Sequence, residues 1–350
     1  MKFKNFPIYR IEWVTSTFLI GTALLSLTVV PWFLWTQFTL ADGAPNKVEG
    51  WGFILALFVF YYYATGFGIT LGYHRLFSHI SFKAKWPVKL FVLLFGAASF
   101  ENSAHDWCAD HRIHHKHVDE DEDPYDISKG FFYAHIGWLL FRLKPPAPIT
   151  NVKDLEADPL VMWQHRYVQW IGAFVGFVCP AALGYGYAVL MGYANPGMTA
   201  LAAFLIAGLL RTVIVQQGTF CINSLCHMIG RRPYSTDHSA RDSGLVALLT
   251  FGEGYHNYHH EFQHDYRNGV KPWQFDPTKW IIWTLSKVGL TEDLRRVPDS
   301  RIMAAELKEK SRTLGRDIDS LAARLDERTR ELKAKSIAAA HELAKELALR

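Results

Sequence analysis

Apolar residues gather in four long runs along the chain. Residues 12–35 carry one acidic residue at their start and then no charge, and residues 51–73 carry none. Two further runs cover 167–193 and 198–215, the second interrupted by Arg211. Because roughly 20 apolar residues cross a bilayer as a helix, the pattern predicts four transmembrane helices. A shorter run at 86–100 predicts a half-buried or interfacial helix.

Basic residues predict the orientation of these helices. The first ten residues, the stretch 74–166 and the C-terminal region are rich in Lys and Arg, whereas the connection 37–50 holds only Lys47. Cytoplasmic loops carry an excess of Lys and Arg, so both termini and residues 74–166 are predicted to be cytoplasmic, at the inner membrane if the cell is bacterial. A cleaved signal peptide is the alternative for the N-terminal run, which is too long for one.

Residues 300–350 differ in composition from the rest. Acids and bases alternate around an apolar seam with roughly heptad spacing, formed by Leu307, Leu314, Ile318, Leu321, Leu325 and Leu332. The favoured interpretation is a solvated amphipathic helix packed on the cytoplasmic side of the protein. Self-association as a coiled coil is the alternative.

These features divide the chain into five segments. They are the N-terminal segment with the first two membrane helices (1–73), a cytoplasmic segment (74–166), two more membrane helices (167–216), a second cytoplasmic segment (217–299) and the charged tail (300–350).

The net charge of +4 suits a membrane surface, and we expect no nucleic-acid partner. The four cysteines show no C-x-x-C spacing, which disfavours a disulfide framework or an iron–sulfur cluster.

Nine of the sixteen histidines are clustered, and each cluster lies close to a predicted membrane boundary on the cytoplasmic side. The four clusters are His74 and His79; His111, His114 and His115; His227, with Asn223 one helical turn before it; and His256, His259 and His260. Both triplets have i, i+3, i+4 spacing, which places them on one helix face. The first pair is spaced i, i+5, so it can converge only if the membrane helix ends or unwinds between the two residues.

Such a cluster is typical of a metal site. Protonated imidazoles would repel one another, and neutral ones would leave buried lone pairs unsatisfied, so a bound cation resolves both problems. Nine ligands exceed what one ion accepts, which predicts two metal ions. Imidazole suits iron, copper and zinc, so the ligands alone do not identify the metal.

Two other classes of protein compete with this interpretation. The segment "HEFQH" (260–264) is an H-E-x-x-H motif, in which Glu261 would be the general base of a zinc metalloprotease and His264 a ligand beside His260. That interpretation leaves the other clustered histidines unexplained. A metal-ion transporter would place its ligands near the bilayer midplane rather than at the helix ends.

The order HxxxxH, HxxHH, an isolated histidine in an "NS…H" segment and HxxHH resembles the membrane fatty-acid desaturases. The segments "DHRIHHK", "GFFYAHIGWLL", "RRPY" and "GEGYHNYHH" are most similar to the Δ9 acyl-CoA (stearoyl-CoA) branch, and the similarity covers residues 65–266. The resemblance implies an all-α integral membrane protein, with four transmembrane helices under a cytoplasmic helical cap that holds a di-iron centre. It also implies that the nine clustered histidines are iron ligands and that Asn223 meets one metal through water.

The resemblance further implies a reaction, in which a di-iron oxidoreductase uses O2 to introduce a cis double bond, Δ9 by similarity, into a long-chain acyl-CoA or another acyl lipid. A related di-iron hydroxylase is the alternative. No haem, flavin or iron–sulfur motif is visible, so we expect a separate electron donor, a reductase with a ferredoxin-like or cytochrome carrier. An apolar tunnel must set the position of the double bond. By similarity its wall contains Asn102, Trp107, Thr219 and Phe220, although ordinary core packing would also account for Trp107 and Phe220.

Several positions depart from the family pattern. Ala109 stands where the family often has an arginine that holds the CoA headgroup, Glu101 where it has glutamine, and Phe220 where it has tryptophan. Arg142 and Arg166 do match basic positions of the family and are expected to bind substrate. Carboxylates near the ligands in sequence, Glu101, Asp106 and Asp110, are expected to orient the imidazoles. The acidic run 119–126 resembles a divalent-ion site, but a solvated loop is favoured.

Overall fold

The computed structural model describes residues 10–143 and 149–348, and its regular structure is almost entirely helical. The chain divides into two compact units: Met1–Arg232 with Asp237–Val297, and Pro233–Thr236 with Pro298–Arg350. The first unit contains every predicted ligand. The second consists mainly of one long helix.

Four helices of the first unit are long and apolar enough to cross a membrane, which confirms the predicted number. The third and fourth extend beyond the apolar runs that predicted them, and the fourth ends at a clustered histidine. In chain order the four consist of α1 (Trp13–Thr39); α2 (Trp51–Phe67) with η3 (Gly68–Ser78); α7 (Pro159–Ala173), η6 (Phe174–Val178) and α8 (Cys179–Met191); and α9 (Pro196–Ala203), η7 (Phe204–Leu210), α10 (Arg211–Ser224) and η8 (Leu225–His227).

Local sequence explains where two of these helices begin. The Asp158 side chain accepts hydrogen bonds from the backbone N–H groups of Leu160 and Val161, and Pro159 occupies the first turn of α7. Asn195 accepts in the same way from Met198 N–H at the start of α9, which also opens with a proline. Both are capping residues followed by proline, the combination expected at a helix N-terminus.

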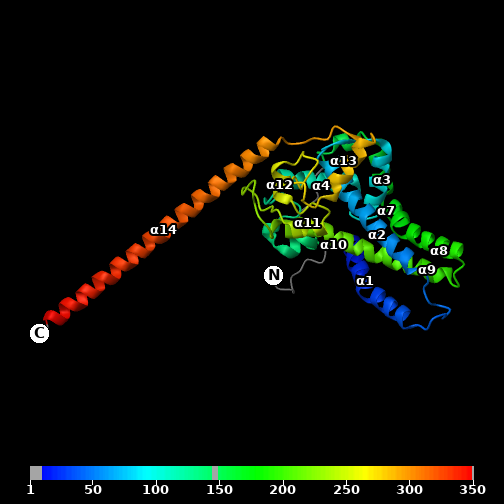
Figure 1. Cartoon of the computed structure of the whole chain (residues 1–350), viewed down its shortest axis with the longest axis horizontal. Helices are drawn as coiled ribbons and strands as arrows, with labels where there is room; N and C mark the ends of the chain where they lie inside the picture. The colour runs from blue at the N-terminus through cyan, green and yellow to red at the C-terminus, as the bar shows by residue number, and fades with distance from the viewer. Residues whose placement is uncertain (1–9, 144–148, 349–350) are drawn as a thin grey trace. The chain divides into compact units, whose positions relative to one another are not determined.

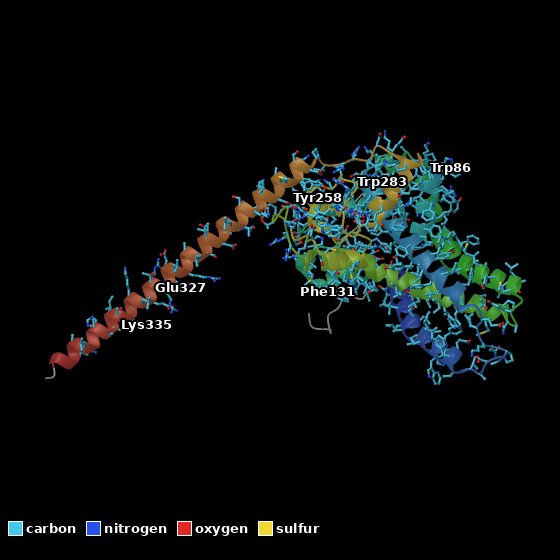
Figure 2. The ribbon with its side chains drawn as sticks, in the orientation of Figure 1. Trp86, Phe131, Tyr258, Trp283, Glu327 and Lys335 are labelled. Atoms are coloured by element: carbon cyan, nitrogen blue, oxygen red, sulfur yellow. The ribbon has the colours of Figure 1, made fainter. Side chains whose placement is uncertain are left out.

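Shorter elements gather at the end of the first unit that carries the histidines (Figure 1). They are β1 (Lys83–Ala84), α3 (Trp86–Ala97), α4 (Ala104–Lys116), η4 (Ile127–Lys129), η5 (Tyr133–Gly137), α5 (Trp138–Leu140), α6 (Lys153–Glu156), α11 (Gly244–Leu249), α12 (His256–Glu261), α13 (Pro277–Lys287) and β2 (Thr291–Glu292). The two strands pair antiparallel. Helix α3 confirms the predicted short apolar helix, and Figure 2 shows Trp86 at its start and Trp283 on α13, both largely exposed.

One apolar core joins η3 to α3, α4 and α13. Tyr73 of η3, Val92 of α3, Cys108 of α4 and Ile282 of α13 are fully buried in it. The helices approach closely because Gly68 faces Gly96: a Cβ atom on Gly68 would lie 2.4 Å from the Gly96 backbone nitrogen. This contact fixes α3 against the helix that carries the first two clustered histidines.

The second unit contains α14 (Asp299–Ala348), a 50-residue helix that confirms the predicted helical tail. Its charged side chains include Glu327 and Lys335, which Figure 2 labels. The apolar seam is solvent-exposed, with exposed fractions of 56–60% for Leu307, Leu314, Ile318, Leu321, Leu325 and Leu332.

Gly68→Ala tests the close approach of α3. The added methyl group meets backbone atoms, which cannot move aside cheaply, so we expect a loss of about 1–3 kcal/mol in the free energy of unfolding and a lower Tm of the purified protein. Gly52→Ala in the same membrane helix is the matched control, because nothing lies within 4 Å of the position that its added methyl group would occupy. Equal Tm values for the two variants would contradict the packing argument.

Candidate metal centre

A π-helix brings the first two clustered histidines together. In η3 the hydrogen bonds run from residue i to residue i−5, and the last of them joins His79 N–H to the His74 carbonyl at 3.1 Å. The wider turn places residues five apart above one another, and the two imidazole centroids lie 4.8 Å apart. The expected unwinding of the membrane helix therefore takes the form of a widened helix that ends at His79.

The nine clustered histidines converge as predicted and separate into two groups. Within each group, one potential ligand atom per residue lies within 4.8 Å of all the others. The first group is His74, His79, His111, His115 and His259, and the second is His114, His227, His256 and His260.

Each HxxHH triplet contributes to both groups. His111 and His115 are spaced i, i+4 and share a helix face, while the neighbouring His114 points into the other group. In α12 the i, i+4 pair His256 and His260 belongs to the second group, and His259 belongs to the first. Helix α4 therefore contributes two histidines to the first group and one to the second, whereas α12 contributes one to the first and two to the second.

The distances within the groups suit metal coordination through Nε2. The Nε2 atom of His259 lies 3.0 Å from that of His74 and 3.0 Å from that of His115. In the second group the Nε2 atom of His260 lies 3.1 Å from that of His256 and 3.3 Å from that of His114. With metal–nitrogen bonds of about 2.1 Å, neighbouring ligand nitrogens at right angles lie about 3.0 Å apart.

Several ligand rings have a fixed orientation through Nδ1. His74 Nδ1 lies 2.9 Å from a Glu253 carboxylate oxygen, and His114 Nδ1 lies 2.9 Å from both oxygens of Asp123. His227 Nδ1 pairs with Ser239 at 2.7 Å, and Ser239 in turn donates to Asp119. Partners of this kind select the tautomer that presents the Nε2 lone pair to a metal.

Burial favours the neutral form of six of the nine imidazoles. It lowers the pKa values of His79, His111, His115, His256, His259 and His260 well below the ordinary value of 6.5, and neighbouring histidines lower them further. Neutral imidazole is the ligand form. Among the described residues nothing satisfies the buried His227 Nε2 atom by hydrogen bonding, as expected of a lone pair reserved for a cation. The donor set therefore fits two metal ions.

A buried ion cluster holds the first group in place. The Arg75 guanidinium donates to Glu253 at 2.9 Å and to Asp276 at 3.1 Å, and all three side chains are at most 1% exposed. Burial by itself raises the pKa of Glu253, but Arg75 and then His74 reverse the effect, so the net shift is downward. Glu253 thus remains a carboxylate that pairs with both Arg75 and the ligand His74.

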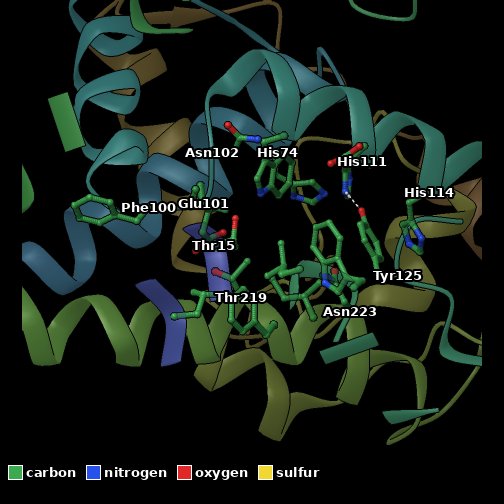
Figure 3. Close-up of a pocket in the computed structure, with 18 of the residues that line it drawn as sticks. Thr15, His74, Phe100, Glu101, Asn102, His111, His114, Tyr125, Thr219 and Asn223 are labelled. Carbon is green, nitrogen blue, oxygen red and sulfur yellow. Dashed lines mark hydrogen bonds between the residues drawn. The ribbon is translucent and has the colours of Figure 1, made fainter. Parts of the chain in front are cut away.

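A cavity of about 480 Å³ reaches both histidine groups. Its wall contains His74 and His111 of the first group and His114 and His256 of the second. All four predicted tunnel residues, Asn102, Trp107, Thr219 and Phe220, line it, together with Asn223. Figure 3 shows Thr219 and Asn223 across the cavity from the labelled histidines. The rest of the lining is mainly apolar, as a site for an alkyl chain requires.

The wall between α3 and α4 has a constrained backbone. Phe100 and Asn102 both have positive φ angles, 57° and 78°, which are uncommon for residues other than glycine. The Phe100 ring packs against Phe18 and Phe177, with centroids 4.9 and 4.8 Å away. Between these two positions, the Glu101 carboxyl interacts with Thr219 and Trp107. Ring packing thus holds Phe100 in its constrained conformation next to Glu101.

Of the remaining predicted site residues, Arg142, Arg166 and Asp106 lie outside the described lining of the cavity. Arg142 pairs with Glu12, and Arg166 stacks on Tyr167 at 5.5 Å; neither belongs to the described lining of the cavity. Asp110 lines the cavity, and burial raises its pKa to about 6. Asp106 contacts His105, which is not one of the clustered nine.

The metalloprotease interpretation is wrong. Helix α12 ends at Glu261, so His260 and His264 do not present their rings from one helix face as the H-E-x-x-H motif requires. The His264 ring instead lies 3.0 Å from the His79 carbonyl, and His260 belongs to the second histidine group.

Sequence reasoning missed most residues that orient the ligands. The acidic run 119–126 is only partly a solvated loop: its middle is exposed, but Asp123 and Asp126 are buried and Asp123 pairs with His114. Glu253 lies three residues before His256, and that proximity is the signal that could have identified it. Ser239 carries no comparable signal, because only the fold brings it to His227.

Comparisons with known proteins agree with this geometry. The sequence pattern of the family described as "Fatty acid desaturase" matches residues 49–289. The chain is 43% identical over 260 residues to a protein named probable acyl-CoA desaturase from Schizosaccharomyces pombe, covering 74% of this chain and 52% of that protein. It is 40% identical over 295 residues to acyl-CoA desaturase 1 from Saccharomyces cerevisiae, covering 81% and 56%. Stearoyl-CoA desaturase from Homo sapiens is 36% identical over 250 residues, covering 70% and 67%.

The chain therefore belongs to the fatty acid desaturase family. It spans about half the length of the two yeast proteins. The matched region contains the second, third and fourth membrane-crossing helices and all nine clustered histidines.

His227→Ala tests whether the histidines form one centre, because His227 stands alone in the sequence. Loss of a direct ligand should lower the bound metal per chain by about half or more, measured by elemental analysis of purified protein, while membrane insertion is unchanged. His264→Ala is the control, since His264 lies outside both histidine groups and its ring pairs with the His79 carbonyl. Full metal content in the first variant and loss in the second would overturn the ligand assignment.

Proposed function

We propose that the protein is an O2-dependent acyl desaturase that introduces a cis double bond, at Δ9, into a long saturated acyl chain bound as acyl-CoA. The observation that carries this proposal is the apolar cavity whose wall includes members of both histidine groups. An alkyl chain in that cavity would place its methylenes beside both metal positions. The names of the relatives support the acyl-CoA class, and the similarity to stearoyl-CoA desaturase is consistent with Δ9.

The metals in this proposal are two irons, one in each histidine group. When bound, they would supply the activation of O2 and the removal of two hydrogens from adjacent methylenes. Imidazole donors suit iron, although they suit copper and zinc as well, so the family relationship decides the choice. Asn223 lines the cavity one helical turn before His227, where it can meet the second metal through water.

The chain's own residues position the substrate and exclude water. Phe100, held between Phe18 and Phe177, closes the cavity at the strained segment. Trp107 stacks on the ligand His111, with 4.8 Å between the ring centroids, so one side chain contacts both the cavity and the metal centre. Since an alkyl chain offers no polar handle, fixed walls of this kind determine which methylenes face the metals.

The proposal has three further parts. Reduction of O2 to water with one desaturation needs two external electrons, so the enzyme takes them from a separate reductase with a ferredoxin-like or cytochrome carrier. The basic residues of the N-terminus and of 74–166 support a cytoplasmic active site, reached by that donor. The exposed heptad seam of α14 supports self-association as a coiled coil.

Mass spectrometry of fatty acids tests the reaction. In cells that express the protein, C16 or C18 chains should appear with a loss of two mass units, and His227→Ala should remove this product. A gain of sixteen units as the main product would instead identify the related hydroxylase. If a protein that carries two irons and receives electrons forms neither product, the proposal is refuted.

Glu101 gives this cavity a pH dependence. Burial raises its pKa from 4.5 to about 8, against the lowering effect of the hydrogen bonds from Thr219 and Trp107. The neutral acid therefore predominates at pH 7, and a negative charge develops beside the alkyl chain as the pH rises through about 8. Because the folded-state pKa is raised, protonation stabilises the fold at low pH, and this contribution falls as the pH rises from 4.5 to about 8.

We expect the KM for the acyl substrate to rise by up to about tenfold per pH unit above pH 8, because the fraction of neutral Glu101 falls at that rate. Glu101→Gln keeps the shape and removes the ionisation, so its KM should stay flat across the same range. The measurement is steady-state kinetics with one acyl substrate from about pH 6 to about pH 10. Parallel KM profiles for the two proteins would show that Glu101 does not titrate in the cavity.

A further inference from the structure

A second cluster of potential metal ligands lies outside the nine histidines. His105 and Asp106 come from the first turn of α4, and His165 comes from α7. One ligand atom from each lies within 4.8 Å of the others. The Asp106 Oδ1 atom is 2.7 Å from His105 Nδ1 and 3.7 Å from His165 Nδ1, and the two imidazole centroids are 4.5 Å apart.

The trio is only partly exposed. Side-chain exposures of 9% for His105, 28% for Asp106 and 34% for His165 leave a cation access from solvent while removing part of its hydration. The Glu156 carboxylate, at the end of α6, lies 3.8 Å from His105 Nε2, at the ring edge opposite the Nδ1 atom that faces Asp106. Glu156 therefore contacts the outer edge of the His105 ring.

The N-terminus of α4 fixes the geometry of the cluster. The Ser103 hydroxyl accepts the Asp106 backbone N–H and lies 2.8 Å from His165 Nδ1, so it ties the start of α4 to α7. Ser103 holds the His165 ring close to Asp106, and an ion bound at the same Nδ1 atom would replace this contact. The three donors thus come from two helices whose packing is already set, which lowers the conformational cost of binding an ion.

We propose that His105, Asp106 and His165 bind one divalent transition-metal ion, zinc foremost, separately from the two histidine groups. Two imidazoles with one carboxylate are a donor set that zinc accepts, and a water molecule would complete its usual tetrahedron. The ion would sit beside the cavity wall, because Trp107 follows Asp106 directly and Val168 lies one helical turn after His165. The inference does not depend on the proposed reaction.

The experiment uses the purified full-length, iron-loaded protein dialysed against Zn²⁺, with zinc and iron measured in the same sample. One zinc per chain is expected at unchanged iron content. His165→Ala, chosen because this side chain is the most exposed of the trio, should weaken zinc binding by about 100-fold or more, since losing a direct ligand exceeds the 10–100-fold effect of losing an outer partner. Asp106→Asn should weaken it less, and X-ray absorption at the zinc edge should report two imidazole ligands.

His117→Ala is the matched control, because His117 at the end of the same helix belongs to an exposed cluster with Glu120 and Glu122. Its zinc content should equal that of the unaltered protein. Tm values measured without zinc exclude misfolding of the variants. Zinc that replaces iron mole for mole, zinc that persists in both His165→Ala and Asp106→Asn, or no zinc in the unaltered protein above the dialysis buffer would each overturn the assignment and leave the trio as a hydrogen-bonded helix contact.

Discussion

The buried interaction between Arg75, Glu253 and Asp276 determines how the site is assembled. Three ionised groups removed from water are costly unless each finds a full set of partners. Here Arg75 also donates to the Tyr266 carbonyl, and Asp276 accepts from the backbone N–H groups of Asn268 and Lys279. The cluster joins the end of the second membrane helix, the loop before α12 and the start of α13. Ligands from distant parts of the sequence can converge only after these three segments meet.

The same cluster connects stability to chemistry through one carboxylate. Glu253 balances the Arg75 charge and also receives the Nδ1 side of His74. Its position is therefore fixed by a structural ion pair before any metal binds. Asp123 has a comparable role for His114, since it is buried by the loop that carries it and also accepts the Tyr125 backbone N–H. Ligand orientation in both groups thus depends on contacts that the fold itself requires.

Patterns local in sequence predicted a large part of this molecule. The apolar runs predicted four membrane helices, and the histidine spacing, read with the family resemblance, identified all nine clustered side chains. The spacing could not assign His114 and His115 to different groups, because that depends on where α12 lies relative to α4. Nor could it predict the π-helix before His79 or the burial of Asp123, since both follow from tertiary packing. Arg142 and Arg166 were inferred by resemblance, and the described cavity does not involve them.

The division of each HxxHH triplet between the groups has a mechanical consequence. A helix is rigid over two turns, so α12 cannot shift relative to α4 without moving donors of both groups at once. The two groups of donors are therefore mechanically linked. If metals were bound, a displacement that lengthened the metal–nitrogen bonds in one group would also change those in the other. Occupancy of either position should pre-align the donors of its neighbour, so loading would be cooperative even though no histidine is shared between the groups.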